Sequence, residues 1–334
     1  MITDTDNSFD PSFFHLFGIT SSKSLRKFSI MVLKQYSSHG IKLAFDNNIL
    51  DLMEKRFNGL KKLNEVQNVQ QVLEIHFKSA SLYMENAENY KNAPPVVIME
   101  DIQRIELTSL DFSLGTLKSK QVFLKVIMEI LTVLEKAHSM GIIHGNISKS
   151  TVFIENNGRA SEFSNVVGSD HIVDNLVLSD YIGVKLGNFG GEAFEPYQYR
   201  EIFGFIPYYY PPEYAVKNLL SGQSWDIYEL SCLIYDLLSG SPGKSGGNIS
   251  LLERRNFIKT RIGNNSMYDN IEQMTNDIER FWIQPLYEIN KNVSIDLWNA
   301  IKKGLEPNPE SRFSGISEMK QFIITVFREN YRLV

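Results

Sequence analysis

The sequence predicts an α+β protein in which a β-rich part comes first and a mostly helical part follows. Segments rich in β-branched and aromatic residues lie before residue 100, whereas apolar residues at helical spacing dominate after residue 120. Strands that precede the helices, rather than alternating with them, favour segregated layers. The chain has 334 residues, a length sufficient for one large domain or a two-lobed one. Of these residues 43% are hydrophobic and 22% are charged, as is usual for a globular protein with a buried core.

Four segments of the first part are predicted to be strands, namely residues 13–19, 27–36, 69–77 and 95–99. The last is a continuous apolar run, as expected of a strand covered on both faces. Apolar residues at helical spacing run up to Leu63 and predict a helix over 46–63, with Asp46 as its N-cap. Residues 101–109 are predicted to cross between two lobes.

The second part is predicted to be mostly helical. A wide apolar stripe from Lys120 onward predicts a long helix that ends near Gly141. One strand is expected at 184–189, and further helices are expected at 225–238, 277–286, 293–305 and 316–328. Residues 156–180 are polar and rich in Ser, Asn and Gly, so we expect a surface insertion there, and residues 240–247 are expected to form a flexible loop.

Composition narrows the classes of partner. The net charge of −5 gives no electrostatic reason to expect nucleic acid or an anionic membrane. Cys232 is the only cysteine, so no internal disulfide can form, and we expect a cytoplasmic protein with a buried thiol at this position. No apolar run is long enough for an integral membrane segment, and the polar, acidic start of the chain is unlike a secretory signal.

The stretch 141–154 follows the long predicted helix and contains the central motif of the sequence. His144 is followed there by apolar residues at Ile147, Val152 and Phe153. This frame resembles the catalytic loop of protein kinases, written His-Arg-Asp-Leu-Lys-x-x-Asn. The family's packing positions are kept, but its Arg, Asp, Lys and Asn are replaced, in that order, by Gly145, Asn146, Ser148 and Thr151.

Further landmarks of the protein kinase superfamily follow in the family's order. Residues 96–101 resemble the strand and hinge that hold adenine, residues 188–190 (Asn-Phe-Gly) resemble the metal-binding Asp-Phe-Gly motif, and residues 211–213 (Pro-Pro-Glu) resemble the Ala-Pro-Glu motif. The resemblance covers roughly residues 13 to 330 and implies a bilobal kinase-like fold. The implied N-lobe is residues 1–101, and the implied C-lobe is residues 102–334 with the insertion at about 156–180.

The resemblance also implies contacts that hold such a fold together. Asp226 stands where the family has a buried Asp that bonds to the backbone around His144. Glu213 and Arg312 stand where the family has a buried ion pair. His144 and Phe189 are expected to stack on one another.

For a nucleotide cleft, the resemblance gives candidate residues but few of the family's phosphate-binding features. The candidates are Lys34, Met99, Glu100, Asp101 and Ile102, with Met99 at the gatekeeper position. Lys34 resembles the family's strand lysine, and the alternative is an ordinary lysine at a strand end. Its expected partner is Glu54, although counting back from Leu63 places Arg56 there, and only Gly18 lies where a glycine-rich loop is expected.

The replaced residues are those that phosphoryl transfer uses. Asn146 is neutral and cannot accept a proton, and Asn188 offers a neutral carbonyl where the metal site has a carboxylate. Ser148 and Thr151 replace the lysine and the asparagine that face the phosphate and the second metal ion. The main prediction is a pseudokinase that is not an enzyme, with a degenerate active site, no metal and no cofactor beyond ATP held without metal. Its expected role is that of a protein-binding scaffold or regulator in vesicle trafficking or signalling.

Two alternatives stay open. A divergent active kinase or nucleotidyl transferase could use non-standard metal-binding residues, such as Asp170 or Asp180 of the insertion. A regulator could instead hold nucleotide without metal and switch between conformations. The surfaces expected to bind partners are the insertion and residues 240–286, although the apolar residues of both could instead pack on the C-lobe.

Overall fold

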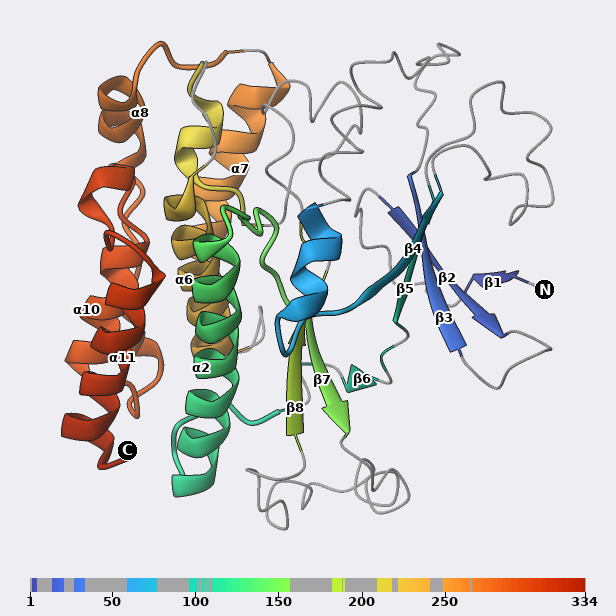
Figure 1. Cartoon of the computed structure of the whole chain (residues 1–334). Coiled ribbons are helices and arrows are strands. Elements are labelled where there is room, and N and C mark those ends of the chain that lie inside the picture. Colours follow the sequence, from blue (N-terminus) through green and yellow to red (C-terminus); the bar gives the residue numbers. More distant parts are fainter. Residues whose placement is uncertain are drawn as a thin grey trace. The chain divides into compact units, whose positions relative to one another are not determined.

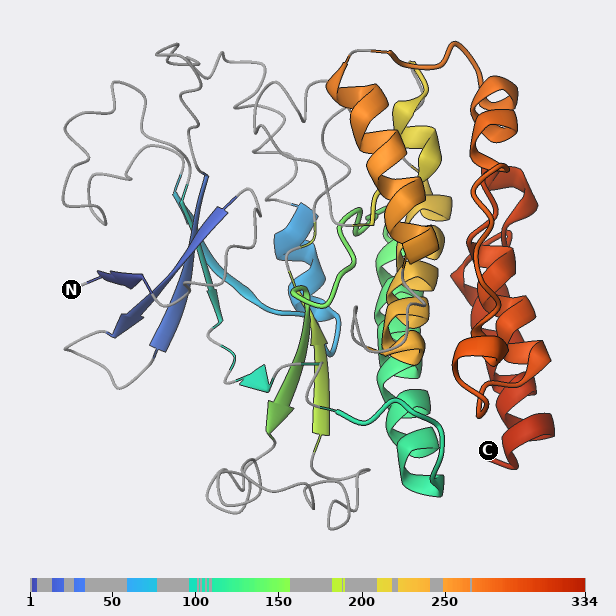
Figure 2. The ribbon, with the colours of Figure 1, turned by 180° about the vertical axis from the view of Figure 1, so that it is seen from behind.

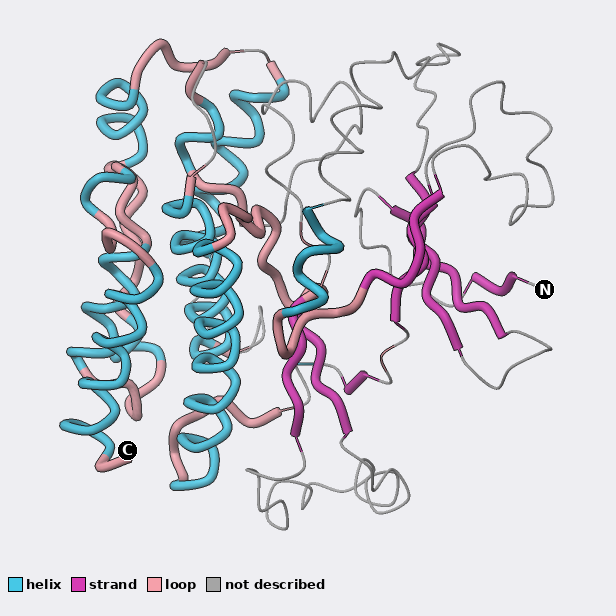
Figure 3. Tube along the Cα trace, viewed as in Figure 1, coloured by secondary structure: helices cyan, strands magenta, loops and turns pink. Residues whose placement is uncertain are grey.

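The computed structural model describes residues 2–4, 14–20, 27–33, 59–76, 96–100, 102, 104–105, 107, 110–156, 182–187, 189, 209–217, 222–240, 249–264 and 266–333. The chain divides into two compact units, Met1–Ile102 with Ala193–Pro207 and Gln103–Glu192 with Tyr208–Val334. Strands predominate in the first unit and helices in the second, so the fold is α+β (Figure 1, Figure 3).

The first unit contains a five-stranded antiparallel sheet in the order β1-β2-β3-β5-β4. Its strands are β1 Ile2–Asp4, β2 Phe14–Thr20, β3 Lys27–Leu33, β4 Val72–His76 and β5 Val96–Glu100. β5 pairs on both sides, with Ile98 opposite Ile30 of β3 and Glu74 of β4. The sequence patterns predicted the other strands but missed β1.

A short helical segment at residues 59–62 and a 3-10 helix, η2 Leu63–Glu65, precede β4. The side chain of Asn64 binds the start of β4 with both ends of its amide. Its Oδ1 accepts a hydrogen bond from the N–H of Val72 (2.9 Å), and its Nδ2 donates to the carbonyl of Val72 (2.7 Å). One side chain thus makes the pair of bonds that a neighbouring antiparallel strand would make. The rest of the helix predicted at 46–63, with its N-cap Asp46, lies outside the described residues.

The second unit contains a small antiparallel sheet and most of the helices. The sheet has the order β6-β7-β8, with β6 Arg104–Ile105, β7 Val152–Asn156 and β8 Ile182–Leu186. The α-helices are α2 Leu117–Ser139, α6 Gln223–Ser239, α7 Ile249–Gly263, α8 Ile271–Ile278, α9 Leu286–Ile289, α10 Ile295–Gly304 and α11 Ile316–Tyr331 (Figure 2). Two 3-10 helices, η8 Pro212–Ala215 and η9 Pro309–Ser311, lie between them in the sequence. Residues 157–181, which include nearly all of the predicted insertion, lie outside the described part of the chain.

Local sequence signals explain where α2 begins and ends. Thr116 and Ser119 form a reciprocal capping box, in which the Thr116 hydroxyl accepts from the N–H of Ser119 (3.0 Å) and the Ser119 hydroxyl oxygen accepts from the N–H of Thr116 (3.0 Å). The helix therefore begins a few residues before the predicted Lys120. It ends at Ser139, just before Gly141, whose φ of 72° a side chain would disfavour.

Helix α6 lies at the centre of the second unit, because all its residues from Trp225 to Ser239 are buried. Helix α10 approaches it at Gly304, where an added Cβ would lie 1.9 Å from the Ser231 hydroxyl oxygen. Only a residue without a side chain allows this approach. α6 can thus hold polar groups in fixed positions, which is its role in the site described below.

In residues 240–286, one predicted helix is wrong and one helix was not predicted. The helix predicted at 277–286 does not exist, since α8 ends at Ile278 and α9 begins at Leu286. α9 begins directly after Pro285, which has no N–H to donate and disfavours helical geometry in the residue before it, so a continuous helix through this position is disfavoured. The helix α7 was missed, because its few buried apolar residues, such as Leu251, Ile258 and Ile262, lie among charged ones.

Two expectations from composition can be compared with the described residues. Cys232 is buried on α6, and burial raises the pKa of its thiol, as expected of a small core residue rather than a reactive one. In the described part of the chain, no helix combines the length and the apolar character that crossing a bilayer requires.

Candidate active-site loop

The loop between α2 and β7 is fixed to helix α6 by the carboxylate of Asp226. Oδ2 of Asp226 accepts from the N–H of His144 (2.8 Å) and from Nε2 of His138 (2.7 Å), and Oδ1 accepts from the N–H of Gly145 (2.7 Å). Asp226 is fully buried. The contacts predicted for Asp226 are therefore confirmed, whereas sequence reasoning missed the contribution of His138.

A second carboxylate on α6 extends this anchor. Oε2 of Glu229 accepts from the N–H of Ile147 at 2.7 Å. Glu229 lies three residues after Asp226, which places both side chains on the same face of the helix. Sequence reasoning also missed Glu229, although this spacing from a recognised position is the signal that could have indicated it.

His144 is held as a neutral imidazole. Its Nδ1 accepts from the N–H of Asn146 (3.1 Å), and its Nε2 donates to the carbonyl of Gly187 (3.0 Å). Only the tautomer with the proton on Nε2 satisfies both bonds. Burial lowers the pKa of His144 from 6.5 to about 4, against the opposing effect of Asp226. His144 is therefore a structural residue at neutral pH.

His144 also packs against Phe189, and the two ring centroids lie 4.3 Å apart. Phe189 is itself buried, with an exposed fraction of 2%. The predicted stacking of these two residues is confirmed. It joins the loop to the segment that follows β8.

The hydroxyl of Thr151 is used within the loop. Oγ1 of Thr151 accepts from the N–H of Ser148 (2.9 Å) and lies 3.1 Å from the carbonyl oxygens of both Asn146 and Ser148, to which it donates. The Ser148 hydroxyl is paired with that of Ser150 (2.8 Å). The loop thus satisfies the hydroxyls of Ser148 and Thr151 from within itself.

The described residues of the loop do not fit Mg²⁺. That ion prefers carboxylate and water oxygens in octahedral geometry, but Asn146 is a neutral amide and the Thr151 hydroxyl is already occupied by three loop contacts. No cluster of three or more acidic, His or Cys side chains suited to a metal occurs among the described residues. Asn188, Asp170 and Asp180 lie outside them.

A buried ion pair closes the segment 209–217 onto the helices. Nη1 and Nη2 of Arg312 donate to Oε1 and Oε2 of Glu213 at 2.6 and 2.7 Å, and both side chains are inaccessible to solvent. Arg312 also donates to the carbonyls of Glu306 (2.8 Å), Ser224 (3.0 Å) and Pro307 (3.1 Å). The predicted pair between Glu213 and Arg312 is confirmed.

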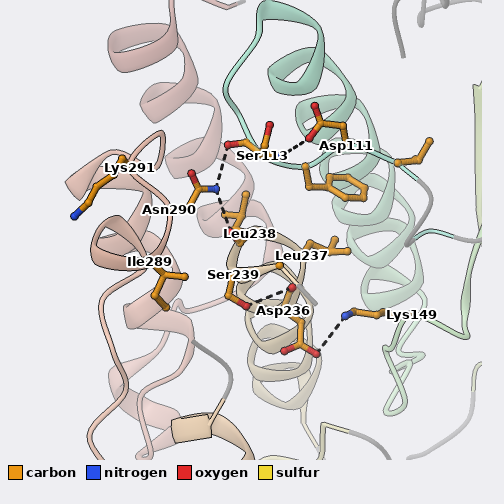
Figure 4. A pocket seen from close by; sticks show the side chains of 13 residues that line it. Asp111, Ser113, Lys149, Asp236, Leu237, Leu238, Ser239, Ile289, Asn290 and Lys291 are labelled. Atoms are coloured by element: carbon orange, nitrogen blue, oxygen red, sulfur yellow. Dashed lines mark hydrogen bonds and ion pairs between the residues drawn. The ribbon is translucent and has the colours of Figure 1, made fainter. Parts of the chain in front are cut away.

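A pocket of about 440 Å³ adjoins the loop at Lys149 (Figure 4). Lys149 faces the carboxylate of Asp236 on α6, with Nζ and Oδ2 3.6 Å apart. The hydroxyl of Tyr209 donates to the same carboxylate oxygen. On the other side of the pocket, Asn290 donates to the carbonyls of Ser113 and Leu238, both at 3.1 Å. The pocket therefore combines polar groups of fixed geometry with apolar residues such as Phe112 and Leu237.

The residues predicted for a nucleotide cleft are described only in part. Lys34 and Asp101 lie outside the described residues, as do Glu54 and Arg56. In the first unit, Met99 and Ile102 are buried, and the carbonyl of Glu100 accepts from Nε2 of Gln70 (3.0 Å). Their role toward a nucleotide stays a prediction.

No protein-family model matches the chain. Among curated proteins, it is 21% identical over 245 residues to the serine/threonine-protein kinase PknB of Mycobacterium leprae, and 25% identical over 228 residues to a probable serine/threonine-protein kinase of Dictyostelium discoideum. These matches cover 72% and 67% of the chain, but only 32% and 46% of the relatives. The chain thus spans less than half the length of either relative.

Solved structures show the same fold. The PknI kinase domain of Mycobacterium tuberculosis, as a double mutant, matches 97% of the chain and 95% of its own length at a TM-score of 0.56 and 11% identity. A crystal structure of Rad53 in complex with AMP-PNP matches 96% of the chain and 64% of its own length at a TM-score of 0.53 and 16% identity. The chain therefore has the bilobal α+β fold of protein kinases, and the predicted resemblance to the protein kinase superfamily is confirmed.

One prediction needs correction. The chain was expected not to be an enzyme, but the curated relatives that it matches carry the names of serine/threonine protein kinases. The error has a physical origin. Replacing individual catalytic groups lowers the catalytic rate. The rest of the site still positions the substrates and stabilises charge, so some activity persists. Substitutions at positions 146 and 188 alone do not establish inactivity.

Proposed function

We propose that the chain is a kinase-fold regulator that binds and orients partner proteins on its helical unit, and that it transfers phosphate more slowly than its serine/threonine kinase relatives. The observation that carries this proposal is the loop at 141–151, which is anchored by two carboxylates of α6 but presents an amide, Asn146, at the family's base position.

The expected loss of rate follows from the chemistry of the amide. Asn146 can form hydrogen bonds with a substrate hydroxyl, but it has no basic site that takes its proton. General base catalysis contributes about 10²- to 10⁴-fold to a rate. The rigid loop can still orient the substrate hydroxyl, because this orientation does not require a general base.

The rigidity of the loop supports the protein-binding part of the proposal. Its backbone N–H groups at 144, 145 and 147 are satisfied from α6, and its side chains at 148 and 151 are satisfied within the loop. A surface that needs no ligand to keep its shape loses little conformational entropy when a partner binds. The pocket beside Lys149 gives this surface a depression in which a partner side chain can lie.

The experiment that tests the proposal is a phosphate-transfer assay on the purified chain with labelled ATP and a mixture of Ser- and Thr-containing peptides. Asn146→Asp restores a carboxylate and should raise the transfer rate by about 10²-fold or more. Asn256→Asp makes the same chemical change at an exposed position of α7 and serves as the matched control, with no expected change. Equal rates for the chain and for Asn146→Asp would refute the role given to the amide.

Nucleotide binding without metal is part of the same proposal, because the described loop residues offer no carboxylate to Mg²⁺. ATP should raise the melting temperature of the chain, and EDTA should leave that rise unchanged, since a ligand that binds only the folded state stabilises it. A rise that requires Mg²⁺ would show that ligands outside the described residues complete a metal site.

A further inference from the structure

Arg254, on α7, is a buried arginine without an acidic partner among the described residues. Its exposed fraction is 5%. Nη1 donates to the carbonyl of Leu305 (2.9 Å) and Nη2 to that of Phe281 (3.4 Å), whereas Nε has no acceptor. The side chain of Arg254 also hydrogen-bonds the phenol of Tyr228, whose pKa is raised by burial and lowered by Arg254. These neighbours are uncharged, so they do not neutralise the guanidinium.

The buried guanidinium of Arg254 lacks the carboxylate partner that normally offsets the cost of burying a charge. Arginine stays protonated in proteins, so it cannot escape the cost of burial by losing its charge. Buried charges are normally paired with an opposite charge and have their remaining donors satisfied. The Nε–H of Arg254 is therefore a donor with a strong preference for an anionic acceptor.

Arg254 lines a pocket of about 310 Å³. Its other walls come from the segment after α8, from α10 and from residues 305–307. Trp298 of α10 is buried and forms an apolar wall, whereas Trp282 has an exposed fraction of 65%. A large aromatic side chain held at the rim of a pocket is the kind of residue that dominates binding energy at protein interfaces.

The charges around the pocket select among anions. Besides Arg254, the lining contains one further cation, Lys302, and two carboxylates, Glu279 and Glu306, and neither acid is paired with Arg254. The formal charges of the lining therefore cancel. Both acids would repel a phosphate group, with close to two negative charges, more strongly than a carboxylate, which carries one charge and fits the planar edge of a guanidinium.

We propose that this pocket binds the carboxylate of an Asp or Glu side chain of a partner protein, and that Trp282 covers an apolar residue next to it. The occupant is thus a protein segment in which an acidic residue follows an apolar one. The proposal rests on the protein-binding part of the proposed function, but it uses no residue of the loop at 141–151.

The test is a titration of the full chain, with ¹⁵N-labelled indole groups, observed by NMR. The sequence contains three tryptophans, and two of them, Trp282 and Trp298, line the pocket. The probe is acetyl-Leu-Asp-amide, and acetyl-Leu-Asn-amide is its uncharged match. Both pocket indoles should shift saturably with the Asp probe, at least tenfold more weakly with the Asn probe, and Trp225 on α6 should not shift.

Variants connect the binding to Arg254. Arg254→Met should weaken the affinity for the Asp probe at least tenfold, while Arg261→Met, on the same helix but outside the lining, should not change it. Trp282→Ala should weaken the affinity for the Asp probe severalfold. It should leave the melting temperature of the chain unchanged, because this side chain is exposed. Trp282→Ala also keeps the proposal testable if Arg254→Met does not fold.

Several outcomes would overturn the proposal. These are no saturable shift, equal affinity for the two probes, tighter binding of inorganic phosphate, or unchanged affinity in a folded Arg254→Met. A lowered melting temperature of Glu279→Gln would also overturn it, since it would mean that Glu279 already pairs with Arg254. Asn146→Asp should bind the probe as the unaltered chain does, so failure here and failure of the phosphate-transfer proposal are distinguishable.

Discussion

Two buried arginines of the helical unit differ in what surrounds them. Arg312 meets both carboxylate oxygens of Glu213 and donates to three backbone carbonyls. Arg254 donates to two backbone carbonyls and hydrogen-bonds the phenol of Tyr228, but it is paired with no carboxylate of the described residues, and its Nε has no acceptor among them. Both side chains are almost inaccessible to solvent, so burial does not explain the difference.

The difference teaches that burial alone does not reveal what a charged residue does. A guanidinium with all its bonds satisfied joins segments of the chain, as Arg312 joins the segment around Glu213 to residues 306–307 and to α6. Arg254 instead lines a pocket without a carboxylate partner among the described residues, which is why we propose an anionic partner for it. The predictions below test this contrast by comparing residues that hold the fold together with residues that face a pocket.

The largest effect is expected at the paired arginine. Arg312→Met leaves the carboxylate of Glu213 buried without its partner, which should cost roughly 3–5 kcal/mol of unfolding free energy. Urea unfolding, followed by circular dichroism, measures this. Lys303→Met is the matched control, because it removes a cation from an exposed pair with Glu318 and should cost less than about 1 kcal/mol. Similar losses in both variants would contradict the importance given to the buried pair.

The second largest effect is expected from protonation of His144. Burial lowers its pKa from 6.5 to about 4, so the unfolded chain binds this proton more readily than the folded one. The stabilisation is fully present above pH 6.5 and should be lost as the pH falls toward 4, by roughly 3 kcal/mol. Unfolding free energies at pH 7 and pH 4.5 measure the loss.

His144→Phe should flatten this pH profile, because phenylalanine keeps an aromatic ring against Phe189 but cannot bind a proton. Carboxylates that titrate in the same range contribute equally to both proteins and cancel in the comparison. A profile of the same slope in both proteins would contradict the role of His144.

The third effect concerns the close approach of α10 to α6. Gly304→Ala would place its Cβ 1.9 Å from the Ser231 hydroxyl oxygen and 2.9 Å from the Ser231 Cβ. Separating the two helices should cost about 1–3 kcal/mol. Gly59→Ala is the control, since an added Cβ there meets nothing within 4 Å. Thermal unfolding of both variants measures the effect, and equal melting temperatures would show that the helices adjust without cost.

The sequence predicted the supports of the loop well, because they depend on residue identity at fixed spacing. Glu213, Asp226 and Arg312 are recognisable from the kinase resemblance, and the structure confirms their contacts. His144 and Phe189 follow from the same frame. The contacts of these residues depend on the backbone geometry of the loop, and the apolar residues at Ile147, Val152 and Phe153 preserve that geometry.

Other features could not be predicted in this way. The bonds of the Thr151 hydroxyl depend on how the loop closes on itself, which residue type alone does not indicate. Nor did spacing show that Arg254 lines a pocket without being paired to a carboxylate of the described residues. The pocket at Arg254 forms where segments distant in sequence meet, whereas the bonds of Thr151 depend on the backbone conformation of the loop, and residue type and spacing indicate neither.

The smallest effect on stability is expected at the arginine without an acidic partner. Arg254→Met removes two hydrogen bonds to carbonyls, each worth about 1 kcal/mol, but it also removes a buried charge without an opposite charge. The two contributions oppose one another, and methionine fills much of the same space, so we expect a change below about 1 kcal/mol. Urea unfolding of Arg254→Met beside Arg312→Met measures the contrast directly. If Arg254→Met lowered the unfolding free energy as much as Arg312→Met, Arg254 would stabilise the fold as Arg312 does. That result would contradict the proposal that the pocket beside Arg254 binds a partner protein.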